Sequence, residues 1–546
     1  MKKIELTKDR NMLFFFGAAI GALLFIITYG TAILDIHYDA WILRSPDIDI
    51  KQHYIGFLNF INDPWTFPIG NTDSLSYPHM MSVVWTDSIP GFCVLIKLLR
   101  FALPKIPQLF GIFGLLTFAL NGAFAALLVY EVVGSRAAAV FSCPFFIMSF
   151  TVLHRMYYHT ALASHWIILA ALLYFYTDRK YSIKRDAAVY ALFSFLCVSI
   201  HSYFLPMAGI ILFFDTVFVN RQKKKISFSM LIPLLSFCIS GIATLFIYGA
   251  FTSGVEHGGF AIGEFNSNLN TLYNSLGYGM LPELPLARGT QYEGFGYLGL
   301  GILVLCVICG GYLIFRVVKS GMKGTLKCLK DHFRILLTVL MGLSFAVISV
   351  FPEADFNETV LIPDILPGVI KRLFGIFRSN GRFIWPLMYI IMLSCIYILF
   401  KMSSKLPAAA FIVLSVCLFL QGADLRSWVA EKNEWYTEKY DYTGYFDEHG
   451  PDHDSFEHIV MTFDNGDLKM DTGYFAAVND KTINRFYFAR VIDKIEQEQL
   501  EKYKEAALSG NPVPGCVYFF NGETLKEWEG ADLTIEKVNE DIYMGY

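Results

Sequence analysis

Four polar clusters interrupt an otherwise apolar chain, and each contains residue types that can do chemistry. The first is Asp47-Ile48-Asp49, followed closely by His53. In an extended segment, carboxylates two residues apart point to the same side and could face one site. Such a pair could take a proton from a hydroxyl, or hold a divalent cation such as Mg²⁺ or Mn²⁺ through oxygen ligands. Because two acids at this spacing are a weak motif, a solvated loop is the alternative.

The second cluster centres on Asp87, in Trp85-Thr86-Asp87-Ser88-Ile89-Pro90, at the mouth of an apolar segment. A carboxylate at that depth is costly unless it is paired, and such residues commonly mark a functional site. The alternative is that Asp87 caps a helix that starts near Pro90. The sequence leaves both interpretations open.

The third and fourth clusters are basic and aromatic. In His154-Arg155-Met156-Tyr157-Tyr158-His159, helical spacing predicts that Arg155 and His159 share one face. Phe377-Arg378-Ser379-Asn380-Gly381-Arg382-Phe383 carries two arginines around a turn, a compact set of donors suited to a phosphate or pyrophosphate. The alternative for all these arginines is an interfacial position in which the side chain reaches out of the lipid.

The elements that must position these clusters are membrane helices. The chain is 55% hydrophobic and 17% charged, whereas a soluble domain is about a quarter charged. From Met12 to Gln421 the apolar segments are near the roughly 20 residues that a crossing needs. We therefore expect an all-α polytopic domain of about 11 to 13 transmembrane helices, because one of the apolar segments between 88 and 176 does not fit the required parity.

The distribution of charge predicts both a domain boundary and an orientation. Residues 424–541 hold 26 of the 48 acids but only 12 of the 44 bases. We expect a transmembrane domain over 1–422, with a long first outer loop over 34–81, and a small soluble α/β or α+β domain over 423–546. In the first loop, helical spacing predicts an amphipathic helix from Tyr54 to Ile61 that lies in the membrane interface. In the soluble domain we expect a helix over Val491–Ala507 and a strand over Cys516–Phe520. Basic loops place the amino terminus in the cytoplasm and the carboxyl-terminal domain outside. All four polar clusters then meet on the outer face, together with Glu256 to Glu293 and His201.

Several short motifs resemble a known family, and the resemblance extends over nearly the whole chain. The motifs are Asp49-Ile50-Lys51-Gln52-His53-Tyr54-Ile55-Gly56, Pro64-Trp65, Pro68-Ile69-Gly70, Thr86-Asp87-Ser88-Ile89-Pro90, Gly381-Arg382-Phe383, Phe475-Ala476, Asn484 and Phe488-Ala489-Arg490. They resemble a bacterial family of polytopic membrane proteins with a domain of unknown function, similar to the glycosyltransferase C (GT-C) superfamily.

The resemblance implies a glycosyltransferase that uses a sugar on a polyprenyl phosphate donor. Asp49 would deprotonate or orient an acceptor hydroxyl on an envelope glycan, with Asp87 beside it, and the anomeric centre would be inverted. The implied substrate-binding and lipid-phosphate-binding residues are Asp47, His53, Arg155, His159, Arg378 and Arg382. The expected location is the bacterial cytoplasmic membrane, with the lipid bilayer as a partner and without nucleic acid. The alternatives are a lipid or polysaccharide transporter or flippase, which Asp215 in an apolar segment favours, and a non-catalytic envelope assembly protein.

Overall fold

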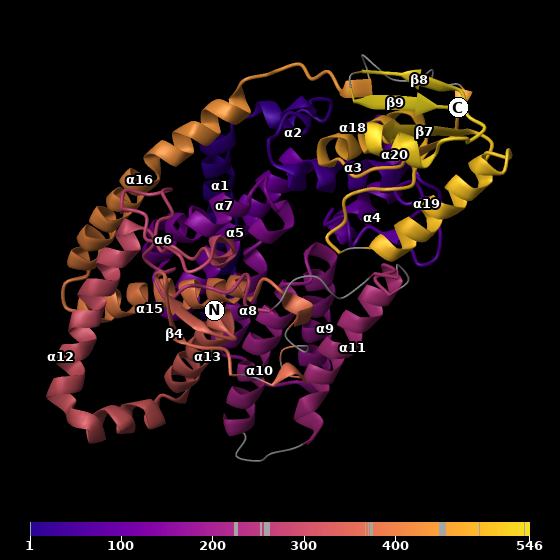
Figure 1. Ribbon diagram of the computed structural model, residues 1–546. Coiled ribbons are helices and arrows are strands. Elements are labelled where there is room, and N and C mark those ends of the chain that lie inside the picture. The colour runs from indigo at the N-terminus through magenta and orange to yellow at the C-terminus, as the bar shows by residue number, and fades with distance from the viewer. Residues whose placement is uncertain are drawn as a thin grey trace.

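The protein is described from a computed structural model that covers residues 1–546. The described residues are 2–222, 228–251, 254, 255, 262–365, 367–369, 371, 375–446, 455–490, 492–539 and 541–546. Glu256, one end of an expected polar segment, lies outside them. The described part is mostly helical, with a small sheet near the carboxyl terminus (Figure 1).

The helices fall into a membrane part and a carboxyl-terminal part. The helices of the membrane part are α1 Lys2–Tyr29, α2 Ala40–Leu43, α3 Ile48–Asn62, α4 Pro90–Leu98, α5 Phe110–Val133, α6 Arg136–Ile147, α7 Phe150–Arg155, α8 Trp166–Tyr176, α9 Ile183–Ile200, α10 Phe204–Gln222, α11 Ile232–Ile247, α12 Leu300–Asp331, α13 Phe333–Val350, α15 Ile384–Met402 and α16 Pro407–Thr437. The carboxyl-terminal helices are α18 Gly466–Asn479, α19 Asp493–Leu508 and α20 Gly522–Glu527. Short 3-10 helices include η3 Thr160–Ala163, η5 Gly289–Gly294 and η7 Asn380–Phe383.

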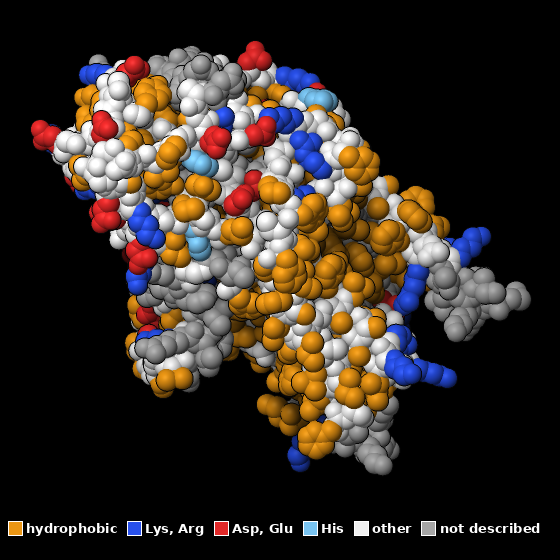
Figure 2. Space-filling view, turned by 90° about the vertical axis from the view of Figure 1, so that its right-hand side faces the viewer, with side chains coloured by type: hydrophobic (Ala, Val, Ile, Leu, Met, Phe, Trp, Pro, Cys, Tyr) orange, Lys and Arg blue, Asp and Glu red, His pale blue; other side chains and the backbone are white. Residues whose placement is uncertain are grey.

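Eight of the described helices are long and apolar enough to cross a membrane. They are Lys8–Tyr29, Phe110–Val133, Phe204–Arg221, Phe228–Ile247, Leu300–Asp331, Phe333–Val350, Asn380–Met402 and Pro407–Thr437. They indicate a membrane-embedded protein, and Figure 2 shows hydrophobic side chains covering the middle of one face. The larger expected number of crossings stays a prediction. The apolar segment 88–103 contains the nine-residue α4 and the three-residue 3-10 helix Arg100–Ala102, and both are too short to cross a bilayer.

The apolar stretch from Arg136 to Tyr176 is built from short helices. Between the 12-residue α6 and the 11-residue α8 lie α7, η3 and a turn in which Tyr157 has a φ of 66°. Because α7 ends at Arg155, the expectation that Arg155 and His159 share a helix face is wrong. His159 instead lies after the turn, at the N-cap of η3.

Helix α1 packs closely along α5 through small residues. A Cβ atom on Gly17 would overlap the backbone oxygen of Gly122, and one on Gly21 would overlap the backbone oxygen of Phe118. Small residues four apart allow the backbones of two membrane helices to approach each other in this way. The amino-terminal helix is therefore anchored to the bundle by backbone contact as well as by side-chain packing.

The first loop contains a buried helix where an interfacial one was expected. The helix predicted from Tyr54 to Ile61 is confirmed as part of α3, but its residues from Gln52 to Ile61 are all buried. Asp47-Ile48-Asp49 is not one extended segment, because α3 begins at Ile48. Asp47 is its N-cap, and its carboxylate accepts a hydrogen bond from the Asp49 amide at 2.8 Å.

The carboxyl-terminal domain is a five-stranded mixed sheet with helices on both faces. The strands are β5 His458–Met461, β6 Thr482–Ile483, β7 Cys516–Asn521, β8 Ile535–Lys537 and β9 Ile542–Gly545, in the order β6-β5-β7-β9-β8. β5 is parallel to β6 and β7, and β9 is antiparallel to β7 and β8. Alternate residues such as Val517 and Tyr518 face different cores, on the sides of α18 and α19 respectively.

The first loop and the carboxyl-terminal domain share one core. Ile55 of α3 packs with Met470 of α18 and Ile459 of β5. The Asn59 amide donates a hydrogen bond to the Gly473 carbonyl at 3.1 Å. The loop also covers the edge of the sheet, where the Ile483 amide donates to Ser74 at 2.7 Å and the Tyr77 amide donates to Ile483 at 2.9 Å. These two parts of the chain must therefore lie on the same side of the membrane.

We predict that Gly21→Ala lowers the thermal unfolding midpoint in detergent, because the new methyl group would force α1 away from Phe118. Overpacking of this kind costs about 1–3 kcal/mol. The matched control is Gly310→Ala in α12, where a Cβ atom meets nothing within 4 Å. Equal midpoints for the two variants, followed by intrinsic fluorescence, would contradict the close α1–α5 packing.

Candidate functional site

The site centres on a carboxylate–imidazole pair contributed by α3 and by the turn after α7. The Asp49 carboxylate lies 2.9 Å from His159 Nε2. Their side chains are 25% and 16% exposed, so both remain open to a ligand. The His53 ring lies one turn along α3 from Asp49, and its centroid is 5.5 Å from that of His159.

Asp87 reaches the same centre from a constrained loop. Its φ is 53° and that of Ile89 is 58°, and Ile89, rather than Asp87, is the N-cap of α4. The interpretation of Asp87 as a helix cap is therefore wrong. Its carboxylate lies 3.7 Å from His201 Nε2, beyond the end of α9. The loop directs the Asp87 carboxylate toward the histidines.

The two candidate catalytic carboxylates differ in acidity. Burial raises the pKa of Asp49, but the hydrogen bond and charge of His159 outweigh it and lower that pKa to about 2. Burial, together with the negative charge of Asp49, raises the pKa of Asp87. Asp49 is therefore ionised at neutral pH, and Asp87 is the stronger proton acceptor.

A buried ion triad lies close enough to the centre for the charge of His159 to act on its carboxylate. Arg155 Nη2 lies 2.7 Å from Glu293 Oε2, and Arg382 Nη2 lies 2.8 Å from the same oxygen. All three side chains are less than 10% exposed. Burial raises the pKa of Glu293, but the charges of Arg155 and Arg382 hold it below its ordinary value. Both guanidinium groups contact Glu293, so Arg155 and Arg382 are held in place, and because one carboxylate offsets only one of the two positive charges, the triad remains positively charged overall.

An apolar groove leads to the arginine turn. It has a volume of about 360 Å³ and is lined by Leu205, Pro206, Gly209, Ile210, Phe213, Phe237 and Phe377. At its end, the Phe377 ring packs on Tyr203 at 5.3 Å. Tyr203 also lies under the Arg382 guanidinium at 4.6 Å and accepts a hydrogen bond from the Ser379 amide at 2.8 Å. The groove, formed mainly by the membrane-length helix α10, therefore borders the turn that carries Arg378 and Arg382.

The carboxyl-terminal domain also reaches the centre. The Ala489 amide donates a hydrogen bond to the Trp85 carbonyl at 2.8 Å, next to the Asp87 loop. Burial and the negative charges of Asp49 and Asp87 raise the pKa of Tyr487. Burial and the nearby Arg378 lower the pKa of Arg490. Tyr487 and Arg490 therefore belong to the surroundings of the site.

The structure brings most of the expected site residues together. Asp49, His53, Asp87 and His159 form the centre, and Arg155 and Arg382 meet at Glu293. Arg378 lies close enough to lower the pKa of Asp87, whereas Asp47 acts mainly as a helix cap. His201 and Glu293 were expected only as outer-face polar positions, and the sequence reasoning missed Tyr203, Tyr487 and Arg490. For Tyr487 and Arg490, the signal was the family motif Phe488-Ala489-Arg490.

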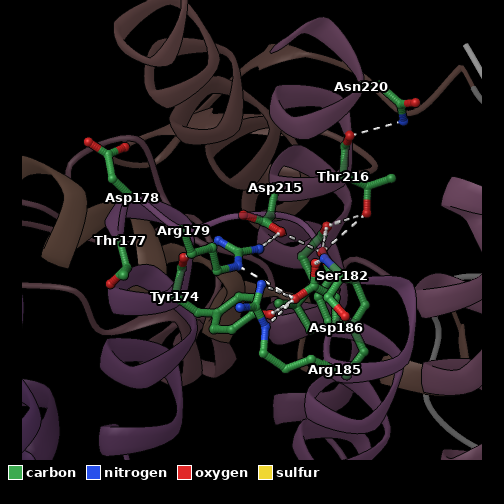
Figure 3. A network of polar contacts seen from close by, with 12 residues as sticks. Tyr174, Thr177, Asp178, Arg179, Ser182, Arg185, Asp186, Asp215, Thr216 and Asn220 are labelled. Atoms are coloured by element: carbon green, nitrogen blue, oxygen red, sulfur yellow. Dashed lines mark hydrogen bonds and ion pairs between the residues drawn. The ribbon is translucent and has the colours of Figure 1, made fainter. Parts of the chain in front are cut away.

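A separate polar network accounts for Asp215, the residue that favoured a transporter. Asp215 in α10 forms an ion pair with Arg179 and accepts a hydrogen bond from Tyr190 at 2.7 Å (Figure 3). Arg179 also contacts Asp186, which accepts a hydrogen bond from Tyr174 at 2.7 Å. The network joins the ends of α8 and α9 farthest from the site. Asp215 is therefore paired within a helix-joining cluster.

Family comparison covers both parts of the chain. The model of a domain of unknown function, DUF6311, matches residues 18–426, and the DUF6311 C-terminal domain matches residues 453–545. The chain belongs to the DUF6311 family. A search among curated proteins finds no match. In this DUF6311 protein, both matched regions contribute residues to the candidate site.

We predict that Glu293→Ala strongly destabilises the protein, because it leaves two buried guanidinium groups without their counter-charge. Removal of one partner from a buried ion pair costs about 3–5 kcal/mol. The lowered pKa means that the stabilisation is complete above pH 4.5, the ordinary pKa, and is lost only as the pH falls further. Thermal unfolding of the purified protein at neutral pH measures the loss.

The control for Glu293 is Glu498→Ala, which breaks an exposed i, i+4 pair with Lys494. Such pairs contribute about 0.3–0.5 kcal/mol, so this variant should unfold near the wild-type temperature. If Glu293→Ala unfolded at the same temperature as Glu498→Ala, the buried triad would not stabilise the fold.

Proposed function

We propose that this DUF6311 protein is a GT-C-type glycosyltransferase of the bacterial cytoplasmic membrane. It would transfer a sugar from a polyprenyl phosphate donor to an envelope glycan on the outer face. The observation that carries the proposal is the proximity of three environments: an apolar groove bordered by Phe377, the arginine turn, and the carboxylate of Asp87, on which the charges of Arg378 and Arg382 act. A lipid-linked sugar phosphate requires these three environments in that order.

The groove and Arg378 fit the lipid phosphate part of the donor. Apolar side chains of α10 and α11 would contact the polyprenyl chain, with Phe377 at the end of the groove. Arg378 follows Phe377 directly, and its guanidinium group lies 5.8 Å from the Phe265 ring centroid. Arginine is well suited to phosphate because its planar donors match the phosphate oxygens. The sugar would then lie toward Asp49 and Asp87.

The two carboxylates fit a single-step displacement. An acceptor hydroxyl attacks the anomeric carbon as the bond from that carbon to the phosphate oxygen breaks, which inverts the centre. Asp49, ionised and held by His159, orients the hydroxyl, and Asp87 accepts its proton. Arg378 stabilises the negative charge that develops on the leaving phosphate. The raised pKa of Asp87 supports its role as the proton acceptor.

The carboxyl-terminal domain fits a role in positioning the acceptor. Tyr487 is 37% exposed and close enough to Asp49 and Asp87 for their charges to raise its pKa. An aromatic ring at the rim of the site offers a surface for a sugar ring. The shared core with the first loop holds this surface in place.

We predict that Asp49→Asn and Asp87→Asn each lower transfer by about 100-fold or more, because each removes a charge or a base from the reacting centre. The assay follows the release of polyprenyl phosphate from a panel of radiolabelled polyprenyl-phosphate sugars in membranes that contain the protein and envelope glycan. Asp532→Asn, at an exposed position of the carboxyl-terminal domain, is the control. If both site variants turned over donor at the wild-type rate, a catalytic role for these carboxylates would be excluded.

A second prediction tests the donor site without an acceptor. Gly209→Trp should fill the groove and Arg378→Gln should remove a phosphate contact, so both should reduce labelling by a photoactivatable polyprenyl phosphate several-fold. Gly310→Trp, where a Cβ atom meets nothing within 4 Å, and Arg426→Gln, at an exposed position in α16, are the matched controls. If all four variants reduced labelling to the same extent, the proposed donor site would be contradicted. Specific labelling without sugar transfer would favour a lipid carrier.

A further inference from the structure

Three potential metal ligands converge at the centre of the site. One ligand atom each from His53, Asp87 and His159 lies within 4.8 Å of the other two, the only such group among the described residues. They come from α3, from the loop before α4 and from the turn after α7. Three separate segments therefore meet at one point. The oxygen ligands expected from the sequence, Asp47 and Asp49, are not part of this group.

Three of the four imidazole nitrogens in this group lack a hydrogen-bond partner. His53 is 1% exposed, and neither of its ring nitrogens has a hydrogen-bond partner. His159 Nδ1 is also buried without a partner, although Nε2 contacts Asp49. An unsatisfied buried polar group costs about 1–3 kcal/mol. A cation bound between His53, Asp87 and His159 would therefore give the unpartnered imidazole nitrogens a ligand to bind.

Neighbouring groups contact two of the three side chains, His159 and Asp87, as supporting groups do in known metal sites. Asp49 accepts a hydrogen from His159 Nε2, which leaves Nδ1 with a lone pair for a metal. The Tyr203 amide donates to His201 Nδ1 at 3.2 Å, so His201 Nε2 carries the hydrogen that faces Asp87. Asp49 and His201 are therefore supporting groups, and His53, Asp87 and His159 are the ligands.

We propose that His53, Asp87 and His159 bind one divalent transition-metal ion of the zinc class. Two imidazoles favour such an ion over Mg²⁺, which prefers oxygen ligands. In a tetrahedral site with bonds of about 2.1 Å, ligand atoms lie about 3.4 Å apart. Small side-chain rotations would bring the three ligand atoms to that spacing and leave one position open. With the ion bound, one carboxylate oxygen of Asp87 would hold the metal and the other would remain for the acceptor hydroxyl. Metal binding is measured without sugar transfer, so this inference is tested separately from the proposed glycosyltransferase activity.

The test is metal binding by the full-length protein, purified in detergent with a tag that contains no histidine. After treatment with a chelator, the protein is titrated with Co²⁺ alone and bound metal is measured by mass spectrometry and visible absorption. We expect one Co²⁺ per chain, displaced by Zn²⁺. His53→Gln, Asp87→Asn and His159→Gln should each weaken binding about tenfold or more, and Asp49→Asn about 10–100-fold.

His154→Phe is the matched control, because His154 is a buried histidine outside the group whose ring stacks on Tyr158. It should bind Co²⁺ as the wild type does. Absence of saturable binding by the wild type would overturn the proposal whatever the variants do. So would folded ligand variants that bind like His154→Phe. If one variant does not fold, the other two carry the comparison.

Discussion

The site depends on one buried carboxylate that binds two arginines from distant parts of the chain. Glu293 holds Arg155, at the end of α7, and Arg382, before α15, at a point with little access to water. Two guanidinium groups would repel each other there if the carboxylate did not lie between them. Because Arg155 and Arg382 are fixed, the turn that carries His159 and the turn that carries Arg378 acquire fixed positions. The pair of Asp49 and His159 is built on this base.

The second constraint is the core shared between the first loop and the carboxyl-terminal domain. Helix α3 carries Asp49 and His53 on one part of its surface and packs Ile55 into the domain core on another. The loop around Asp87 is hydrogen-bonded to the segment that carries Tyr487 and Arg490. Docking of the domain is therefore coupled to the position of the carboxylates. Figure 2 shows charged side chains over this end of the molecule, above the hydrophobic middle.

Local patterns predicted local structure well and long-range contacts poorly. The helix at Tyr54–Ile61, the helix over most of 491–507 and the strand at 516–520 follow from periodicity and residue type, and each is present. Apolar composition did not distinguish a membrane crossing from a short buried helix such as α4, because both exclude water. The pairing of Asp49 with His159 joins residues 110 positions apart, and the local sequence around either residue does not predict this contact. Only the expectation that the polar loops emerge together anticipated the centre.

The central claim is that the first loop, the arginine turn and the carboxyl-terminal domain meet on one side of the membrane. Labelling of single cysteines tests this claim most directly. With the exposed Cys238 and Cys328 replaced by alanine, cysteine is introduced at His37, Leu361, Glu529 or Lys323, all exposed positions. A membrane-impermeant maleimide on intact cells should label the first three positions. These lie in the first loop, in the antiparallel pair of β3 (Ala354–Phe356) and β4 (Thr359–Ile362) that precedes the arginine turn, and in the carboxyl-terminal domain. Lys323→Cys should react only after the membrane is opened. Labelling of His37→Cys on intact cells with protection of Leu361→Cys or Glu529→Cys would contradict the assembled site.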